Sequence, residues 1–373
     1  MQLSEQVAPI TLPTPGRPVR RLYVLDGLRV VAALSVVLFH YTATNDAWGK
    51  NTKAVFPHLH SFSQYGWIGV ELFFLISGFV ICMSTWGRSL GDFAVSRISR
   101  LYPGYWIAVL ATAAVLTLWP TYRSVQNWTQ VMTNLTMLQH GMGVRDIDGA
   151  YWTLFAELKF YVLFAIVVAR GVTYRGCVLF CAVWTLAGIV DYTVDIPVLD
   201  MWTMPLYSPY FVAGIAFYLM YRFKPTAVLW AIVGLSFFLG EQNMAKRVKF
   251  NGPSEHHVAS VWPAQVLLAL CFLLMALVAL RKLDRVQWGW LTTAGALTYP
   301  MYLLHENIGL TCVALLRDRY PAHVLVAVLI VVLAVLSYLM YRLGERPLGK
   351  WLRGALRKGM DEIRENSPAV RGR

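Results

Sequence analysis

The stretch LDGLRVVAALSVVLFHY, residues 25–41, has the apolar composition of a membrane-spanning helix but carries three ionisable side chains. A helix that crosses a bilayer needs about 20 mostly apolar residues, and this stretch with its neighbours supplies them. Asp26, Arg29 and His40 are costly in hydrocarbon, so such side chains usually face a bundle interior or a water-filled cavity. The stretch therefore predicts a first transmembrane helix with one polar face.

Composition extends this prediction to the whole chain. Of the 373 residues, 57% are hydrophobic and only 14% are charged, and the mean hydropathy is +0.51. Windows long enough to span a bilayer recur with little room between them for a soluble domain. We predict an all-α integral membrane protein, a single bundle of about ten transmembrane helices at residues 22–44, 65–86, 101–119, 151–169, 174–192, 205–221, 226–241, 261–281, 290–314 and 322–343.

Basic residues gather on one side of this predicted bundle. The net charge is +13, and the side that holds both ends of the chain has most of the Lys and Arg. This is the positive-inside bias, so both termini are predicted to be cytoplasmic and the charge does not indicate nucleic-acid binding. Residues 1–21 are expected to form a flexible cytoplasmic tail, residues 22–348 the membrane domain and residues 349–373 a basic cytoplasmic tail. The five cysteines indicate neither a disulfide framework nor a metal site.

Arg29 and His40 lie on one face of the first span. They are eleven residues apart, almost three turns, which separates them by roughly 16 Å along the helix axis. Asp26 and Arg29 also fit a structural ion pair, and a lone histidine can simply bond a carbonyl group. In the next span, GWIGVELFFLISGFVICMS, Glu71 lies at a depth similar to that of His40. Because consecutive spans usually pack side by side, we expect Glu71 to contact His40 and fix its tautomer.

Two arginines precede the third span. In FAVSRISRLYPGYW, Arg97 and Arg100 stand three residues apart on one helical face at the cytoplasmic surface. Pro103 follows, where the chain is expected to turn into the membrane. Paired guanidinium groups suit phosphates, so these two arginines and Arg29 could converge on one phosphorylated ligand. The alternative is topogenic charge that binds lipid headgroups.

The fourth and ninth spans hold the remaining polar candidates. In GAYWTLFAELKFYVLFAI, Glu157 and Lys159 point about 200° apart, so we expect Glu157 to line a cavity and Lys159 to face elsewhere. In LTYPMYLLHENIGL, Pro300 should kink the helix and free carbonyl groups beside a cavity. The alternative for the aromatic side chains is a place in the interfacial aromatic belts, and the alternative for His305 is a structural hydrogen bond. The residues that we predict to bind substrate are Trp152, Lys159, Tyr161, Tyr302 and His305.

Five pieces of the sequence, taken in order, resemble acyltransferase family three. They are LDGLRVVAALSVVLFH, GWIGVELFFLISGF, RISRLYP, YWTLFAELKFY and YPMYLLH. Members of this family are ten-helix membrane enzymes that acylate hydroxyl groups of cell-surface glycans, nodulation factors and macrolide antibiotics. Some relatives carry a further extracellular domain that finishes the transfer. For this chain the resemblance implies a transfer that is completed within the membrane domain.

The resemblance implies a role for each matched position. His40 corresponds to the family's essential histidine, Arg29 to its partner arginine, and Glu157 to a conserved glutamate. Arg97 and Arg100 correspond to the arginines that engage acyl-coenzyme A. We therefore predict an O-acyltransferase of the bacterial cytoplasmic membrane that uses acyl-coenzyme A, with acetyl-coenzyme A as the expected donor. The expected acceptor is a hydroxyl group of a carbohydrate or of a glycosylated or macrolide natural product. The catalytic candidates are His40, Glu71 and Glu157. No metal is expected.

Two alternatives stand beside this prediction. His40 acts either as general base on the acceptor hydroxyl or as a nucleophile that forms an acyl-histidine. A multi-pass transporter or flippase of a glycan or lipid-linked substrate would also carry buried acids and histidines, which relay protons. Against transport, the two halves of the sequence show no matching pair of interrupted spans.

Overall fold

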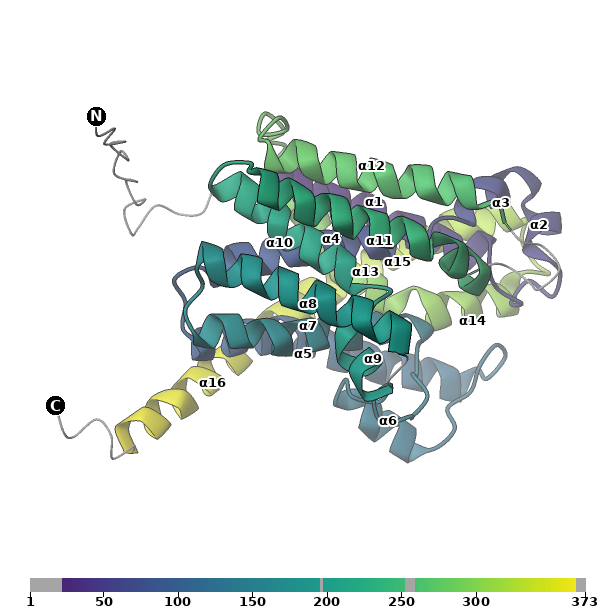
Figure 1. Ribbon diagram of the computed structural model, residues 1–373. Coiled ribbons are helices and arrows are strands. Elements are labelled where there is room, and N and C mark those ends of the chain that lie inside the picture. Colours follow the sequence, from purple (N-terminus) through teal and green to yellow (C-terminus); the bar gives the residue numbers. More distant parts are fainter. Residues whose placement is uncertain (1–21, 195–196, 252–258, 367–373) are drawn as a thin grey trace, which may run out of the picture.

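The computed structural model describes residues 22–194, 197–251 and 259–366. Within these ranges the chain is helical, without a strand, and the long helices run side by side (Figure 1). The all-α prediction is therefore confirmed. The predicted cytoplasmic tail at residues 1–21 lies outside the described residues, as does the end of the second tail at residues 367–373.

Each predicted span corresponds to a helix. In chain order these helices are α1 (Tyr23–Thr42), α4 (Ile68–Thr85), α5 (Leu90–Leu118), α7 (Trp152–Ala169), α8 (Tyr174–Val194), α10 (Ser208–Arg222), α11 (Ala227–Asn251), α12 (Val261–Ala279), α13 (Trp290–Leu304) followed by α14 (Glu306–Leu316), and α15 (Ala322–Leu339). Shorter helices connect them: α2 (Thr52–Val55), α3 (Pro57–Ser63), α6 (Trp128–Leu135), the 3-10 turn η1 (Gly149–Tyr151) and α9 (Pro197–Thr203). A π-helical turn, η2 (Met340–Glu345), leads from α15 into α16 (Arg346–Asn366).

Eight helices in the described part of the chain are long and apolar enough to cross a membrane. The chain is therefore a multi-pass membrane protein. Two of the helices at predicted spans are shorter, because α10 and α13 have 15 residues each. The predicted ninth span is an interrupted helix, since α13 ends at Leu304 and α14 begins at Glu306.

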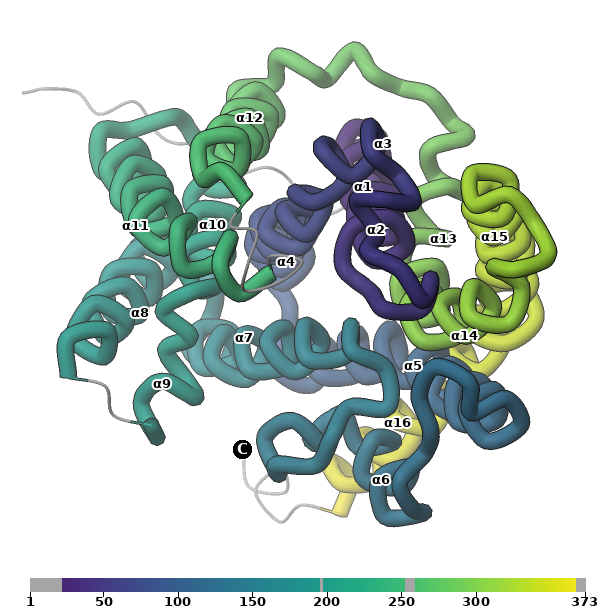
Figure 2. The backbone as a smooth tube through the Cα atoms, turned by 90° about the vertical axis from the view of Figure 1, so that its right-hand side faces the viewer, coloured from purple at the N-terminus to yellow at the C-terminus, as the bar shows by residue number. Residues whose placement is uncertain are grey.

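Helix α4 lies between α1 and α10 at the centre of the bundle (Figure 2). Glycines set both approaches. A Cβ atom at Gly69 would lie 2.5 Å from the carbonyl oxygen of Ala32 in α1, and one at Gly78 would overlap the carbonyl oxygen of Phe211 in α10. Because glycine has no Cβ, the backbones touch on both sides of α4, and α10 is buried along almost its whole length.

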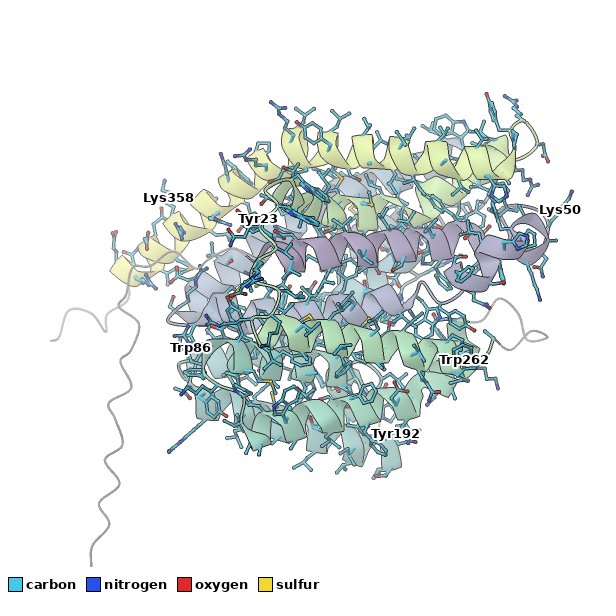
Figure 3. The ribbon with its side chains drawn as sticks, turned by 90° about the horizontal axis from the view of Figure 1, so that it is seen from above. Tyr23, Lys50, Trp86, Tyr192, Trp262 and Lys358 are labelled. Atoms are coloured by element: carbon cyan, nitrogen blue, oxygen red, sulfur yellow. The ribbon has the colours of Figure 1, made fainter. Side chains whose placement is uncertain are left out.

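The bundle has two distinct ends. Tyr23 and Trp86 lie at the end from which α16 leaves the bundle, where Lys358 is, and Lys50 and Trp262 lie at the opposite end (Figure 3). We call these the α16 end and the far end. Because α1 runs from Tyr23 toward Lys50, its first turns, with Arg29, are near the α16 end, and its last turns, with His40, are near the far end.

Three boundaries differ from the prediction. Helix α5 begins at Leu90, because the Ser89 hydroxyl caps it by accepting a hydrogen bond from the Asp92 N–H (3.1 Å). It then continues through Pro103, where the sequence predicts that the chain turns into the membrane. Proline lacks a backbone N–H, so the helix loses one hydrogen bond at this position and keeps the others. Helix α11 continues to Asn251, beyond the predicted end at residue 241. Residues 346–366, predicted in part as a tail, form the amphipathic helix α16.

Candidate active site

A cavity of about 270 Å³ lies between α1, α4, α5, α7 and α13. Its lining includes Arg29, Arg97 and Arg100, so the fold brings together the three arginines that the sequence placed on one side of the membrane. We call this cavity the arginine pocket. Val70 and Ile81 of α4 both line it, and eleven residues of helix extend about 16 Å. The arginine pocket is therefore long and narrow, with guanidinium groups from α1 and α5 in its wall.

The three arginines differ in what they contact. Nη1 of Arg29 lies 3.6 Å from Oδ1 of Asp26, so the structural ion pair forms and Arg29 lines the pocket as well. The guanidinium of Arg97 lies 5.9 Å from the centre of the Tyr161 ring. Its Nε is buried and has no hydrogen-bond partner among the described residues. A buried donor without a partner is costly, and a bound phosphate would supply the missing acceptor. Arg100 is exposed.

Glu157 lines the arginine pocket in α7, as expected. Its Oε1 accepts hydrogen bonds from the Ser77 hydroxyl (2.6 Å) and the Tyr161 hydroxyl (2.5 Å). These bonds hold the carboxylate in place beside the arginines. Lys159 points to another face, with its Nζ 4.9 Å from the centre of the Phe155 ring. The helical geometry that separated Glu157 from Lys159 in the sequence is therefore confirmed.

His40 does not line the arginine pocket; it belongs to a cluster beyond the pocket's Tyr302. The rings of His40 and His305 lie 5.1 Å apart, and those of His305 and Tyr302 lie 5.4 Å apart. Nδ1 of His305 lies 2.6 Å from the Tyr302 carbonyl oxygen, which can only accept, so Nδ1 carries the proton. Nε2 of His305 is then a lone-pair acceptor, and it has no partner within the described chain.

The break between α13 and α14 places this cluster. It falls at His305, five residues beyond the proline that the sequence singled out. Tyr41 donates a hydrogen bond to the carbonyl oxygen of His305 (2.9 Å), and Tyr151 donates to that of Leu303 (3.1 Å). Tyrosines of α1 and η1 therefore donate to two carbonyl groups at the break, and the His305 carbonyl also accepts from the Gly309 N–H (3.2 Å), which suits a break inside a membrane domain.

The expected contact between Glu71 and His40 is wrong. Oε1 of Glu71 instead accepts hydrogen bonds from Nε (3.1 Å) and Nη2 (2.5 Å) of Arg247, and both side chains are buried. The carboxylate nearest to His40 is Glu306, with Oε1 3.8 Å from Nδ1. Sequence reasoning missed Arg247 because the predicted spans 226–241 and 261–281 leave it in the connection between them. The buried positions of α11, Val233, Ser236, Gly240 and Met244, continue the helical spacing to Arg247 and could have revealed it.

Two further cavities lie along the 119–150 segment and α7. The first, of about 510 Å³, is lined by residues that include Tyr122, Arg123, His140, Arg145, Asp146 and Glu306; we call it the loop pocket. The second, of about 280 Å³, includes Trp152, Lys159 and Asp200; we call it the lysine pocket. Of the residues predicted to bind substrate, Tyr161 and Tyr302 thus line the arginine pocket, Trp152 and Lys159 line the lysine pocket, and His305 lies in the cluster.

His40, His305 and Glu306 also have the spacing of a metal site, because one ligand atom from each lies within 4.8 Å of the others. Two imidazoles and a carboxylate are donors that zinc accepts. His305 and Glu306 are neighbours in sequence, and only the fold brings His40 close to them. No sequence motif therefore predicts these three residues as a metal site. The absence of a metal stays a prediction, and treatment with EDTA distinguishes a metal ligand from a base.

Asp148 ties the 119–150 segment, which lines part of the loop pocket, to α14. Its Oδ2 accepts a hydrogen bond from the Asn307 N–H (2.9 Å) and its Oδ1 accepts from the Ala150 N–H (3.1 Å), in a fully buried position. Asp148→Ala leaves two buried N–H groups without acceptors, so we expect the free energy of unfolding to fall by about 2–4 kcal/mol. Unfolding by SDS in mixed micelles measures this. Asp148→Asn keeps one acceptor oxygen and should lose less; an equal loss in both variants would contradict the two-bond account.

The comparisons with known proteins agree on one family. The family model described as acyltransferase domain matches residues 22–342. MdmB of Streptomyces mycarofaciens, an acyltransferase, is 27% identical over 192 residues, which are 49% of this chain and 47% of MdmB. OatA of Listeria monocytogenes, a peptidoglycan O-acetyltransferase, is 24% identical over 159 residues, which are 37% of this chain and 23% of OatA. The chain thus spans less than half the length of these relatives, and no solved structure matches it.

The matched region runs from the start of α1 into η2. It therefore contains all the helices that line the arginine pocket, together with His40, His305 and Glu306. Because the family model covers most of the chain, the protein belongs to the acyltransferase family that its five sequence motifs resemble.

Proposed function

We propose that the protein moves an acetyl or other short acyl group from acyl-coenzyme A to a hydroxyl group of a carbohydrate or of a glycosylated or macrolide product. The observation that carries this proposal is the arginine pocket, which joins three guanidinium groups to a long cavity that ends beside the His40 cluster. The name of one relative supports a carbohydrate acceptor, because OatA is a peptidoglycan O-acetyltransferase. The setting is a bacterial cytoplasmic membrane crossed ten times, with both termini cytoplasmic.

The donor fits the arginine pocket by charge and length. Arg29, Arg97 and Arg100 bind the phosphates of coenzyme A, which paired guanidinium groups favour. The pantetheine arm extends along α4 toward Tyr302, over roughly 16 Å. The Tyr302 hydroxyl bonds with that of Thr153 (2.9 Å), and the Tyr302 ring lies between the pocket and His305. Turning this side chain aside opens the way from the thioester to His40.

The chemical step needs a base and a leaving thiol. His40 removes the proton of the acceptor hydroxyl while the hydroxyl oxygen bonds to the thioester carbonyl carbon. The carbon–sulfur bond then breaks, and the coenzyme A thiolate takes the proton from the imidazolium. The products are an O-acyl ester and free coenzyme A, so no oxidant or further reactant is required.

Acetyl-coenzyme A should stabilise the purified protein through the arginines. At a concentration 100-fold above Kd, a ligand stabilises its target by about 2.7 kcal/mol, which thermal unfolding in detergent detects. Arg97→Ala with Arg100→Ala removes two charged contacts, so we expect Kd for acetyl-coenzyme A to rise roughly 100-fold. Arg88→Ala is the matched control, because Arg88 is exposed and does not line the pocket. Failure of acetyl-coenzyme A to stabilise the parent protein would favour transport of a glycan or lipid-linked substrate.

A further inference from the structure

Two cavities reach the surroundings of the His40 cluster at different residues. The arginine pocket reaches Tyr302, and the loop pocket reaches Glu306, whose Oε1 lies 3.8 Å from Nδ1 of His40. In the sequence, His305 at the helix break lies between Tyr302 and Glu306. A molecule in the loop pocket would therefore meet His40 from the side of Glu306, away from the arginines that suit a coenzyme A donor.

The two cavities also differ in charge. The arginine pocket has three arginines and the single carboxylate of Glu157 in its wall. The loop pocket balances Arg123 and Arg145 with Asp146 and Glu306. A balanced set of donors and acceptors does not select a polyanion such as coenzyme A, and it suits a hydroxyl-rich molecule.

Side chains in the loop pocket leave bonding capacity for such a molecule. The Arg123 guanidinium lies 4.8 Å from the centre of the Tyr122 ring. Nδ1 of His140 contacts Oδ2 of Asp146 at 3.2 Å. Oε2 of Glu306 is buried without a hydrogen-bond partner in the described part of the chain. An aromatic ring beside charged donors and an unpaired acceptor provides both stacking and hydrogen bonds for a sugar ring.

The loop pocket and the lysine pocket share one lining residue. His140 lines both cavities, which measure about 510 and 280 Å³. The lysine pocket adds the indole of Trp152, 4.9 Å from the ring of Tyr207, and the amine of Lys159. Adjoining cavities with aromatic side chains suit an extended ligand of several rings more than a single compact one.

We propose that the loop pocket binds the acceptor and that the acceptor is a glycan chain. One sugar of the glycan places a hydroxyl beside Glu306 and His40, and the chain runs past His140 toward Trp152 and Lys159. The donor and the acceptor thus reach His40 through separate cavities. This assignment rests on the proposed function, because it names the acceptor site of the same reaction.

A protection experiment tests binding without depending on catalysis. The full chain carrying Arg123→Cys is reconstituted in lipid nanodiscs, and a membrane-impermeant methanethiosulfonate reagent modifies the introduced thiol. Chitotetraose, a chain of four N-acetylglucosamine units, at ten times its Kd should slow this modification about 10-fold. Arg319→Cys is the matched control, because Arg319 is exposed and does not line the loop pocket. The parent chain, with its own five cysteines, gives the background rate.

A transfer experiment tests the length of the site. Acetyl transfer from acetyl-coenzyme A is measured to chitotetraose and to single N-acetylglucosamine. Lys159→Ala should raise KM for chitotetraose about 10-fold, because a charged contact is lost, and should leave KM for the single sugar unchanged. The thiol adduct on Arg123→Cys should suppress transfer while acetyl-coenzyme A still stabilises the protein.

The outcomes separate the acceptor site from the proposed function. Protection without any acetyl transfer supports the site and contradicts the function. Transfer that the adduct leaves unchanged supports the function and overturns the site. Equal protection of the Arg123→Cys and Arg319→Cys thiols overturns the site, as does a panel in which chitotetraose gives neither protection nor transfer.

Discussion

His40→Ala is expected to bind acetyl-coenzyme A like the parent protein and to transfer acyl groups about 10²–10⁴-fold more slowly, the usual effect of losing a general base. The imidazole lies between Glu306 and His305, at the place where the arginine pocket and the loop pocket approach each other. Donor binding depends on arginines near the α16 end, so it should survive. Single-turnover transfer with labelled acetyl-coenzyme A, together with thermal stabilisation by the same ligand, measures the two quantities separately.

Controls separate the possible roles of His40. His58→Ala removes an exposed imidazole of α3 and should transfer at the parent rate. Acid quenching tests the acyl-histidine alternative: label that stays on the parent protein and is missing from His40→Ala supports a covalent intermediate. Loss of the parent's activity in EDTA would make His40, His305 and Glu306 a metal site. A folded His40→Ala protein that transfers near the parent rate shows that the base is elsewhere.

The second large effect concerns stability. Arg247→Met is expected to lower the free energy of unfolding by about 3–5 kcal/mol, because it leaves a buried carboxylate without its counter-charge. Glu71 is fully buried, and its Oε1 accepts both hydrogen bonds from Arg247. Arg247 also donates to the Tyr207 hydroxyl (3.0 Å) and lies over the Trp67 ring. SDS-induced unfolding of the purified variant measures the loss.

A double variant tests this explanation. Glu71→Gln combined with Arg247→Met removes both charges, so it should recover much of the stability that the single change loses. The pH–rate profile of Glu71→Gln should match that of the parent in whatever fraction folds, because Glu71 pairs with Arg247 and not with His40. A loss below about 1 kcal/mol in Arg247→Met, the range of an exposed pair, would mean that solvent reaches the pair.

The sequence predicted the spans well because a spanning helix is a local property. Length, hydropathy and the 3.6-residue period located each helix to within a few residues in most cases. The same period placed Glu157 and Lys159 on different faces of the helix. In the structure Glu157 lines the arginine pocket and Lys159 lines the lysine pocket. The predictions failed where a helix continued into polar sequence: α5 begins well before residue 101, and α11 carries Arg247 into the bundle.

Hydropathy and helical periodicity do not predict which side chains of different helices contact each other. Glu71 and Arg247 are 176 positions apart, and a carboxylate in one span gives no sign of which distant span supplies its arginine. Glu306 was visible beside His305, but its closeness to His40 depends on the break between α13 and α14 and on the Tyr41 bond that positions it. The loop pocket likewise lies between the 119–150 segment and α14, which Asp148 ties together.

The sequence by itself therefore determined the membrane helices, their polar faces and the presence of arginines near one end of α1 and of α5, since each of these follows from the order of residues within one helix. The tertiary structure alone decided which carboxylate faces His40, which arginine neutralises Glu71 and where a second cavity meets the imidazole. The physical reason is that these contacts depend on how closely whole helices pack. The glycines of α4 and the interruption after α13 set that packing through backbone atoms, and the sequence gives no sign of which distant residues those atoms contact.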